Sequence, residues 1–277
     1  NYKKCYLQIA RNNVKYTGTI MYDVRGNIMS SKYKRVLLKL SGEAIAKKDS
    51  HEIFDNEKIA EIATVVKKLT DDGVQVGIVI GAGNIWRGAY GKGVKRARAD
   101  QMGMLGTMIN CLRMEDALEK SGCSARVMSP VGMNSFAEQY DFRKAISYLE
   151  SGTVVLFGAG TGIPFVTTDT TVVVRAAEIE ADVILMAKNI DGIYTKDPVD
   201  KDGNIDRSVP RYKIVSYDEC LVKGLHATDV SASALAKEQK INMYVFALKE
   251  PENILKAASG EEIGTLVTYE DTDAIMY

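Results

Sequence analysis

The sequence has 277 residues, enough for one large domain or two small ones, and its apolar (46 %) and charged (26 %) fractions are typical of a folded globular chain. Lys plus Arg and Asp plus Glu both number 36, and this zero net charge argues against binding to nucleic acid or to an anionic membrane surface. The sequence also contains no apolar run of roughly 18 residues, the length of a membrane helix, and no signal-peptide pattern.

Cysteine and histidine are both scarce, and this limits the kinds of catalytic and metal sites that the chain can form. The four cysteines are scattered without a C-x-x-C pair, which predicts reduced thiols in a cytoplasmic protein rather than a disulfide framework or a zinc site. Only two histidines are present, which disfavours a Ser-His-Asp mechanism and a metal site built from several histidines. We therefore expect no metal site built from protein side chains.

The first 30 residues differ from the rest because they show no sustained hydrophobic period. We expect residues 1–30 to be a disordered or non-native N-terminal extension, with a short native arm as the alternative. A single domain over residues 31–277 then follows.

From Arg35 onward, apolar runs of strand length alternate with helical periods. The predicted strands are 35–40, 74–80, 125–128, 153–157, 182–187, 243–247 and 265–268. The predicted helices are 55–72, about 100–121, 141–150, 170–180, a short one opened by the capping box 216–219, 232–239 and one that begins at Pro251. This alternation predicts an α/β fold, a three-layer α/β/α sandwich whose central sheet is mostly parallel. Ligands of such folds bind beyond the carboxyl ends of the strands.

Glycine-containing segments follow the first two predicted strands. Lys39-Leu-Ser-Gly-Glu43 places an ammonium group beside loop amides, which suits an anionic group but also fits an ordinary turn. Gly81-Ala-Gly-Asn-Ile-Trp-Arg-Gly88 offers close backbone approach and the guanidinium of Arg87. Trp86 stands where a dinucleotide fingerprint has its third glycine, and the chain has no P-loop pattern.

Two later segments have similar potential. Residues 158–169 run through three glycines and several hydroxyls into a helix, which favours anion binding, although Thr167, Thr168 or Asp169 could simply cap that helix. Residues 188–198 contain an Asp-Gly turn and Tyr194, whose ring could stack on a base; a β-hairpin is the alternative. Several phosphate-compatible loops with few proton-transfer groups favour phosphoryl transfer, which depends mainly on positioning and charge.

These motifs, in this order, resemble the bacterial uridylate kinases of the amino-acid kinase family, over about residues 33–269. The resemblance rests on segments 39–43, 81–88, 100–104, 160–169, 178–182 and 191–198. It implies the amino-acid kinase fold, with an acceptor half at about 31–165 and an ATP half at about 166–277. It implies transfer of the γ-phosphoryl group of ATP to UMP, giving UDP in pyrimidine nucleotide biosynthesis, with Mg²⁺ bridging the ATP phosphates. It also implies a homohexamer, with UTP as an inhibitor and GTP as an activator.

The resemblance also implies roles for individual residues. The implied catalytic residues are Lys39, Arg87, Asp169 and Asp229, of which Lys39 offsets charge on the transferring group and Asp229 is equally well placed as a helix N-cap. The implied ATP-binding residues are Lys39, Ser41, Gly42, Gly83, Arg87, Lys188, Asn189, Tyr194 and Asp197. The implied UMP-binding residues are Ala82, Asp100, Thr161, Gly162, Ile163, Phe165, Thr167 and Thr168. The chain departs from the family pattern at Ala82, usually Gly, and at Ile163, usually Asn.

Three alternatives remain beside this reading. An amino-acid or carbamate kinase would share the fold, but Asp100 and the Thr-Thr-Asp segment suit a sugar and a phosphate better. A non-catalytic sensor of UMP or UTP is suggested by the departures at Ala82 and Ile163. A dinucleotide-binding oxidoreductase is disfavoured by the broken fingerprint at Trp86.

Overall fold

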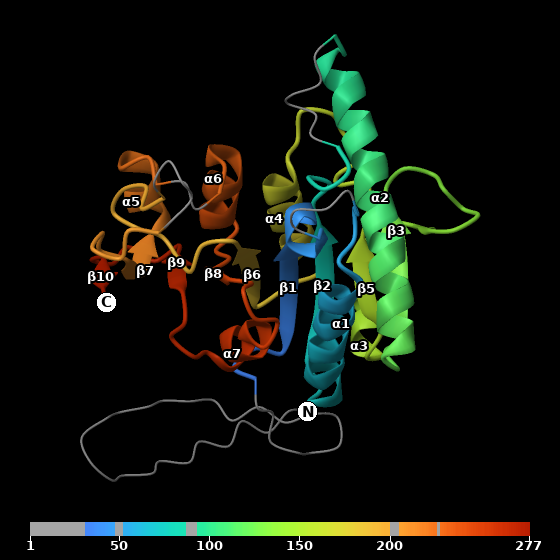
Figure 1. Cartoon of the computed structure of the whole chain (residues 1–277), viewed down its shortest axis with the longest axis horizontal. Helices are drawn as coiled ribbons and strands as arrows, with labels where there is room; N and C mark the ends of the chain where they lie inside the picture. The colour runs from blue at the N-terminus through green and yellow to red at the C-terminus, as the bar shows by residue number, and fades with distance from the viewer. Residues whose placement is uncertain (1–30, 48–51, 87–92, 200–204, 226–227) are drawn as a thin grey trace.

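The computed structural model describes residues 31–47, 52–86, 93–199, 205–225 and 228–277 (Figure 1). The predicted N-terminal extension and Arg87 lie outside these residues, so the predictions made for them are not tested by the structure.

The described residues form one sheet of ten strands in the order β10-β7-β9-β8-β6-β1-β2-β5-β3-β4. The strands are β1 (Arg35–Leu40), β2 (Gln75–Ile80), β3 (Ala125–Ser129), β4 (Glu138–Gln139), β5 (Val154–Phe157), β6 (Val183–Lys188), β7 (Tyr212–Ser216), β8 (Met243–Ala247), β9 (Thr265–Thr268) and β10 (Ile275–Met276). Neighbouring strands are parallel except for the pairs β8–β9 and β7–β10. The predicted mostly parallel sheet is therefore confirmed.

Helices cover both faces of the sheet (Figure 1). They are the 3₁₀ helix η1 (Gly42–Ile45) and the α-helices α1 (Asn56–Asp71), α2 (Arg96–Lys120), α3 (Phe142–Glu150), α4 (Thr168–Glu178), α5 (Tyr217–Val222), α6 (Val230–Glu238) and α7 (Asn253–Ser259). One apolar core joins α1, α2 and α7 to the sheet, and a second core joins α3, α4, α5 and α6 to it. This arrangement confirms the α/β/α sandwich.

Local sequence signals set several element boundaries. All six residues of β1 are buried, as expected for a parallel strand covered on both faces. The Asp55 side chain accepts a hydrogen bond from the Lys58 amide at 3.1 Å and so caps α1. After α1, Gly73 adopts a left-handed φ of 82°, a conformation in which glycine avoids the clash of a Cβ.

Other boundaries differ from the prediction. Helix α2 begins at Arg96, about one turn before the predicted start, and α7 begins at Asn253, two residues after Pro251. Strands β4, β7 and β10 were not predicted. Two of them have only two residues each, too short for a period-2 pattern to be recognised, and β7 mixes buried and half-buried positions. No helix in the described ranges is both long enough and apolar enough to cross a membrane.

Candidate active site

The loops that follow β1 and β2 lie against each other at the carboxyl edge of the sheet. A Cβ on Gly42 would stand 2.6 Å from the Gly81 carbonyl oxygen and 2.7 Å from the Gly83 amide nitrogen, so no larger residue fits without movement. The fully buried Asn110 of α2 donates to the Gly81 carbonyl at 2.7 Å and to Asn84 Oδ1 at 2.8 Å. The close approach at Gly42 thus brings the two glycine loops into contact, and Asn110 holds the second of them in place.

Two lysines flank one carboxylate at this edge. Lys39 Nζ of β1 lies 2.9 Å from Asp169 Oδ1, in the first turn of α4, and Lys188 Nζ, at the end of β6, lies 4.0 Å from Asp169 Oδ2. Strand β6 pairs directly with β1, which brings the two lysines to the same place. Burial lowers the pKa of Lys188; the Asp169 charge opposes this effect, and the Lys39 charge adds to it. Lys39, Asp169 and Lys188, here called the lysine cluster, place positive charge in a largely buried position.

Asp229 connects the first turns of α4 and α6. Its Oδ1 accepts from the Ala232 amide at 2.8 Å, which makes Asp229 the N-cap of α6. Its carboxylate also accepts hydrogen bonds from the hydroxyls of Thr167 and Thr170, the latter at 3.2 Å. Thr167 in turn caps α4 by accepting from the Thr170 amide at 3.1 Å. The alternative role of Asp229 as an N-cap is thus present in the structure.

A cavity of about 210 Å³ opens beside these helix ends. It is lined by Ala82, Trp86, Arg96, Ala99, Asp100, Gly103, Met104, Thr107, Gly160, Thr161, Ile163, Val166, Thr167, Thr168 and Thr171. Six of the eight residues predicted to bind UMP are in this lining, and the other two, Gly162 and Phe165, are not. The Asp100 carboxylate accepts from Arg96 Nε at 2.9 Å and from the Phe165 amide at 2.9 Å, so it also holds the loop that closes one side of the cavity.

The residues predicted to bind ATP differ from one another in burial and in hydrogen bonding. Ser41 accepts from the Ala44 amide at 3.2 Å and caps η1, and Asp197 accepts from the Val199 amide at 2.9 Å in an exposed turn. Asn189 is exposed directly after β6. Tyr194 is only 6 % exposed and donates its hydroxyl to Asp191 at 2.8 Å. The Tyr194 ring is thus largely buried in this structure, and its role in stacking on a base stays a prediction.

The structure adds residues that the sequence did not reveal. Arg175 of α4 is buried, donates from Nη2 to the Gly160 carbonyl at 3.1 Å, and lies with its guanidinium carbon 3.8 Å from the Tyr140 ring centroid. The Thr107 hydroxyl accepts from the Ala159 amide at 2.9 Å. Both side chains hold the Ala159–Gly160 turn, in which the two residues have positive φ angles. The sequence signal that could have indicated Arg175 is a charged residue among the apolar positions of a helix.

Several known proteins are similar to this chain over most of its length. The model of the amino acid kinase family matches residues 34–247. The crystal structure of a UMP kinase from Bacillus anthracis is 36 % identical, covers 88 % of this chain and 99 % of its own, and superposes with a TM-score of 0.82. A UMP kinase from Ureaplasma parvum gives 32 % identity, 87 % and 98 % coverage and a TM-score of 0.78. A uridylate kinase from Archaeoglobus fulgidus is 28 % identical, covers 84 % of this chain and 99 % of its own, and superposes with a TM-score of 0.65.

Proposed function

This chain belongs to the amino acid kinase family, and from that premise we propose that it transfers the γ-phosphoryl group of ATP to UMP, giving UDP and ADP. The observation that carries the proposal is the pair of lysines around Asp169 beside a cavity lined with hydroxyls and Asp100. Positive charge for phosphates and hydrogen-bonding groups for a sugar thus occur at one edge of the sheet, where ligands of α/β folds bind.

In the proposed reaction, an oxygen of the UMP phosphate attacks the γ-phosphorus of ATP, and the bond from that phosphorus to the β–γ bridging oxygen breaks. The attacking oxygen is already anionic at neutral pH, so the step needs no general base, in keeping with the histidine-poor sequence. Lys39 balances the charge that spreads over the transferring group, and Asp169 keeps the ammonium group in position. Lys188 supplies a second positive charge on the other side of Asp169.

Mg²⁺ is the implied cofactor, and the donor set of the site fits it. Among the described residues, no group of three or more His, Cys, Asp or Glu side chains could hold a metal ion. Mg²⁺ in kinases is held mainly by substrate phosphates and water with one or two carboxylates, and Asp169, while paired with Lys39, is the carboxylate of this site that could contact the water shell of the ion. When bound, the ion would neutralise charge on the ATP phosphates.

We propose that UMP binds mainly to the acceptor half, about residues 31–165, and ATP mainly to the half at about 166–277. Thr167 and Thr168, at the start of α4, also line the UMP cavity, and the loops after β1 and β2 are proposed to contact the ATP phosphates as well. An ionised carboxylate can accept about four hydrogen bonds, so Asp100 could receive the ribose hydroxyls while it holds Arg96 and the Phe165 amide. Thr161 and Thr168 offer hydroxyls to the UMP base or phosphate from the cavity wall. Arg87 is proposed to contact the phosphates on resemblance alone.

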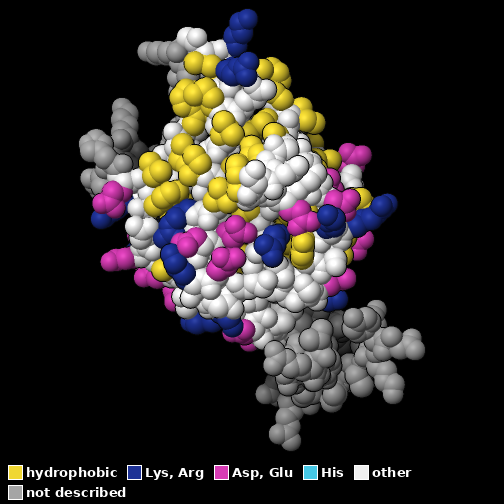
Figure 2. All heavy atoms as spheres, turned by 90° about the vertical axis from the view of Figure 1, so that its right-hand side faces the viewer, with side chains coloured by type: hydrophobic (Ala, Val, Ile, Leu, Met, Phe, Trp, Pro, Cys, Tyr) yellow, Lys and Arg dark blue, Asp and Glu magenta, His cyan; other side chains and the backbone are white. Residues whose placement is uncertain are grey.

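The proposal extends to self-association as a homohexamer. Figure 2 shows hydrophobic side chains gathered on the side of the molecule that carries α2. Five large apolar side chains of α2 and of the loop after β3 are exposed and are here called the apolar face: Met102, Leu105, Ile109, Val131 and Phe136. The first three of these lie along α2 at helical spacing, with Leu105 53 % and Ile109 45 % exposed. Exposed apolar surface of this kind is typical of protein interfaces, which supports association between copies of the chain.

Regulation and location complete the proposal. UTP is proposed as an inhibitor and GTP as an activator, both on resemblance alone. Cytoplasmic location is supported by the three cysteines of the described residues, Cys111, Cys123 and Cys220, which are free and buried.

A panel of phosphate acceptors tests the proposed function. ADP production is measured with UMP, CMP, dCMP, carbamate and amino acids as acceptors, with and without GTP and UTP. We expect UMP to give the highest kcat/KM by a wide margin. A rate with UMP no higher than with the other acceptors would remove the proposal, and tight UTP binding without any turnover would favour the nucleotide sensor.

A further inference from the structure

The C-terminal segment (residues 270–277) forms the edge of the sheet in the ATP half. Strand β10 pairs antiparallel with β7, so that Ile275 faces Ile214 and Met276 faces Tyr212. The Tyr277 amide then donates to the Arg211 carbonyl at 3.1 Å. This segment lies beyond residues 34–247, the part that matches the family model.

The Tyr277 side chain is anchored at both ends. Its hydroxyl lies 2.8 Å from the carbonyl oxygens of Glu262 and Gly264, in the turn before β9. Its ring lies under the guanidinium of Arg211, whose central carbon is 4.1 Å from the ring centroid. A guanidinium stacked on an aromatic ring is attracted to it and loses side-chain freedom, so Tyr277 restricts where Arg211 can point.

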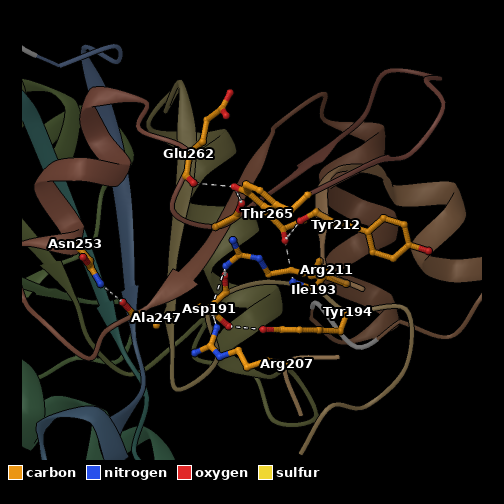
Figure 3. Close-up of polar contacts among 12 residues, drawn as sticks. Asp191, Ile193, Tyr194, Arg207, Arg211, Tyr212, Ala247, Asn253, Glu262 and Thr265 are labelled. Atoms are coloured by element: carbon orange, nitrogen blue, oxygen red, sulfur yellow. Dashed lines mark hydrogen bonds and ion pairs between the residues drawn. The ribbon is translucent and has the colours of Figure 1, made fainter. Parts of the chain in front are cut away.

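Arg211, restricted in this way by Tyr277, in turn contacts Asp191 (Figure 3). Its Nη1 donates to the Asp191 backbone carbonyl at 2.8 Å and lies 3.1 Å from Asp191 Oδ2. Both side chains are largely buried, at 19 % and 18 % exposed. One guanidinium therefore holds the main chain and the side chain of the same residue.

Asp191 is the central residue of its loop. Its carboxylate accepts from the Tyr194 hydroxyl at 2.8 Å and from Arg207 Nη1 at 2.6 Å (Figure 3). Burial opposes ionisation of Asp191, but these two hydrogen bonds and the Arg211 charge outweigh it and lower its pKa. An ionised Asp191 is thus surrounded by three donors, which fix the turn that follows β6.

Backbone contacts hold the same turn from the sheet side. The Ile193 amide donates to Thr265 Oγ1 at 2.9 Å, and that hydroxyl donates to the Tyr212 carbonyl at 2.5 Å. The Tyr212 amide donates to the Ile193 carbonyl at 2.8 Å. The turn is therefore continuous with β7 and β9, and Asp191 lies three residues after Lys188 of the lysine cluster.

We propose that the C-terminal segment positions the ATP-binding segment, residues 188–198, through Tyr277 and Arg211. This inference rests on the proposed function, since residues 188–198 are those expected to hold adenosine. Tyr277, Arg211 and Asp191 are positioning residues, because they order the loop before the nucleotide arrives and so lower the entropy cost of binding. Loss of the contact should weaken ATP binding and leave UMP binding unchanged, since no residue after Thr171 lines the UMP cavity.

The test compares three variants in steady-state kinetics. Tyr277→Ala removes the ring and the hydroxyl and should raise the KM for ATP about three- to tenfold, with the KM for UMP unchanged. Tyr277→Phe keeps the ring over Arg211 and should recover most of the ATP affinity. Asp271→Ala, at an exposed position of the same segment, serves as the control and should match the wild type.

A KM for ATP in Tyr277→Ala that equals the wild-type value would overturn the inference, as would an equal rise in both KM values. If Tyr277→Ala does not fold, Arg211→Lys replaces it, because lysine keeps the charge but cannot span the Asp191 carbonyl and carboxylate together. If the wild type fails to phosphorylate UMP, the proposed function falls. Titration of wild type and Tyr277→Ala with a fluorescent ATP analogue then still decides the inference, through the same loss of affinity or its absence.

Discussion

At the scale of single residues, Lys39 is the side chain on which the proposed chemistry depends most. It is 8 % exposed, and its ammonium group is fixed by Asp169 at 2.9 Å. Replacing Lys39 by Ala removes a charge that acts mainly on the transition state, so kcat should fall about 10²–10³-fold, roughly 3–4 kcal/mol, with little change in the KM for UMP. Steady-state kinetics at saturating ATP measure both quantities.

The matched control for this variant is Lys47→Ala, which removes a lysine whose ion pair with Glu52 is solvent-exposed. Exposed pairs of this kind contribute little, so the control should keep wild-type kinetics. A Lys39→Ala variant whose kcat stays within about threefold of the wild type would show that Lys39 has no role in the transition state.

Arg175 offers a second test at this scale. Arg175→Met keeps most of the buried volume but removes the donor to Gly160 and the partner of Glu178. We expect the free energy of unfolding to fall by roughly 1–3 kcal/mol, and the KM for UMP to rise because Gly160 lines the cavity. Chemical denaturation and kinetics check the two effects. Lys120→Met, which removes an exposed i,i+4 partner of Asp116, should change neither quantity, and an unchanged UMP KM in Arg175→Met would refute the positioning role.

The sequence predicted residues of this site only where they stand in local motifs. Lys39, Asp100 and Thr167 belong to short patterns of glycines, hydroxyls and charges, and the structure brings them to one edge of the sheet. Arg175 contacts Gly160, 15 residues away along the chain, because α4 brings its side chain to the Ala159–Gly160 turn. Such contacts depend on the tertiary fold: the sequence shows a charged residue on the apolar face of a helix, but not which residue it contacts.

At the scale of elements, the ends of α4 and α6 are joined by Asp229. Asp229→Ala removes the N-cap of α6, worth about 1 kcal/mol, and also leaves the hydroxyls of Thr167 and Thr170 without this acceptor. We therefore expect a larger loss of stability than a cap alone gives. Asp229→Asn keeps an acceptor oxygen and should recover most of the loss.

The control for the cap is Asp55→Ala, because Asp55 caps α1 through the Lys58 amide. Thermal or urea denaturation of the two alanine variants should show that Asp229→Ala lowers the unfolding free energy more than Asp55→Ala does. Equal losses would mean that the hydrogen bonds between α4 and α6 contribute nothing to stability.

Strands and helices with a clear local sequence pattern have the predicted boundaries. Those with a weak pattern were missed or begin at a different residue. Strands β1, β8 and β9 have the predicted boundaries because each is a short run made mostly of apolar and β-branched residues. Strand β10 exists through its pairing with β7, and its two exposed residues carry no pattern of their own. The start of α2 at Arg96 was missed because its N-cap position, Lys95, makes no side-chain capping bond.

At the scale of the whole molecule, the apolar face predicts association. Leu105→Asp places a charge in the middle of the apolar stripe of α2, which a buried interface would not tolerate. Native mass spectrometry should find the wild type at six times the 30.4 kDa of one chain and Leu105→Asp at a smaller multiple. Val222→Asp, at an 87 % exposed apolar position on α5, is the matched control and should keep the wild-type mass. A wild type that runs as a monomer would contradict the proposed assembly.

The central claim is that this chain moves the terminal phosphoryl group of ATP to UMP at the lysine cluster. The most direct measurement incubates the purified protein with Mg²⁺, UMP and ATP labelled in its γ-phosphate, and follows the label by separating the nucleotides. The account predicts that the label appears in the β-phosphate of UDP with the wild type, and that Lys39→Ala slows its appearance at least 10²-fold. Label released only as inorganic phosphate, or carried to UDP equally fast by Lys39→Ala, would contradict it.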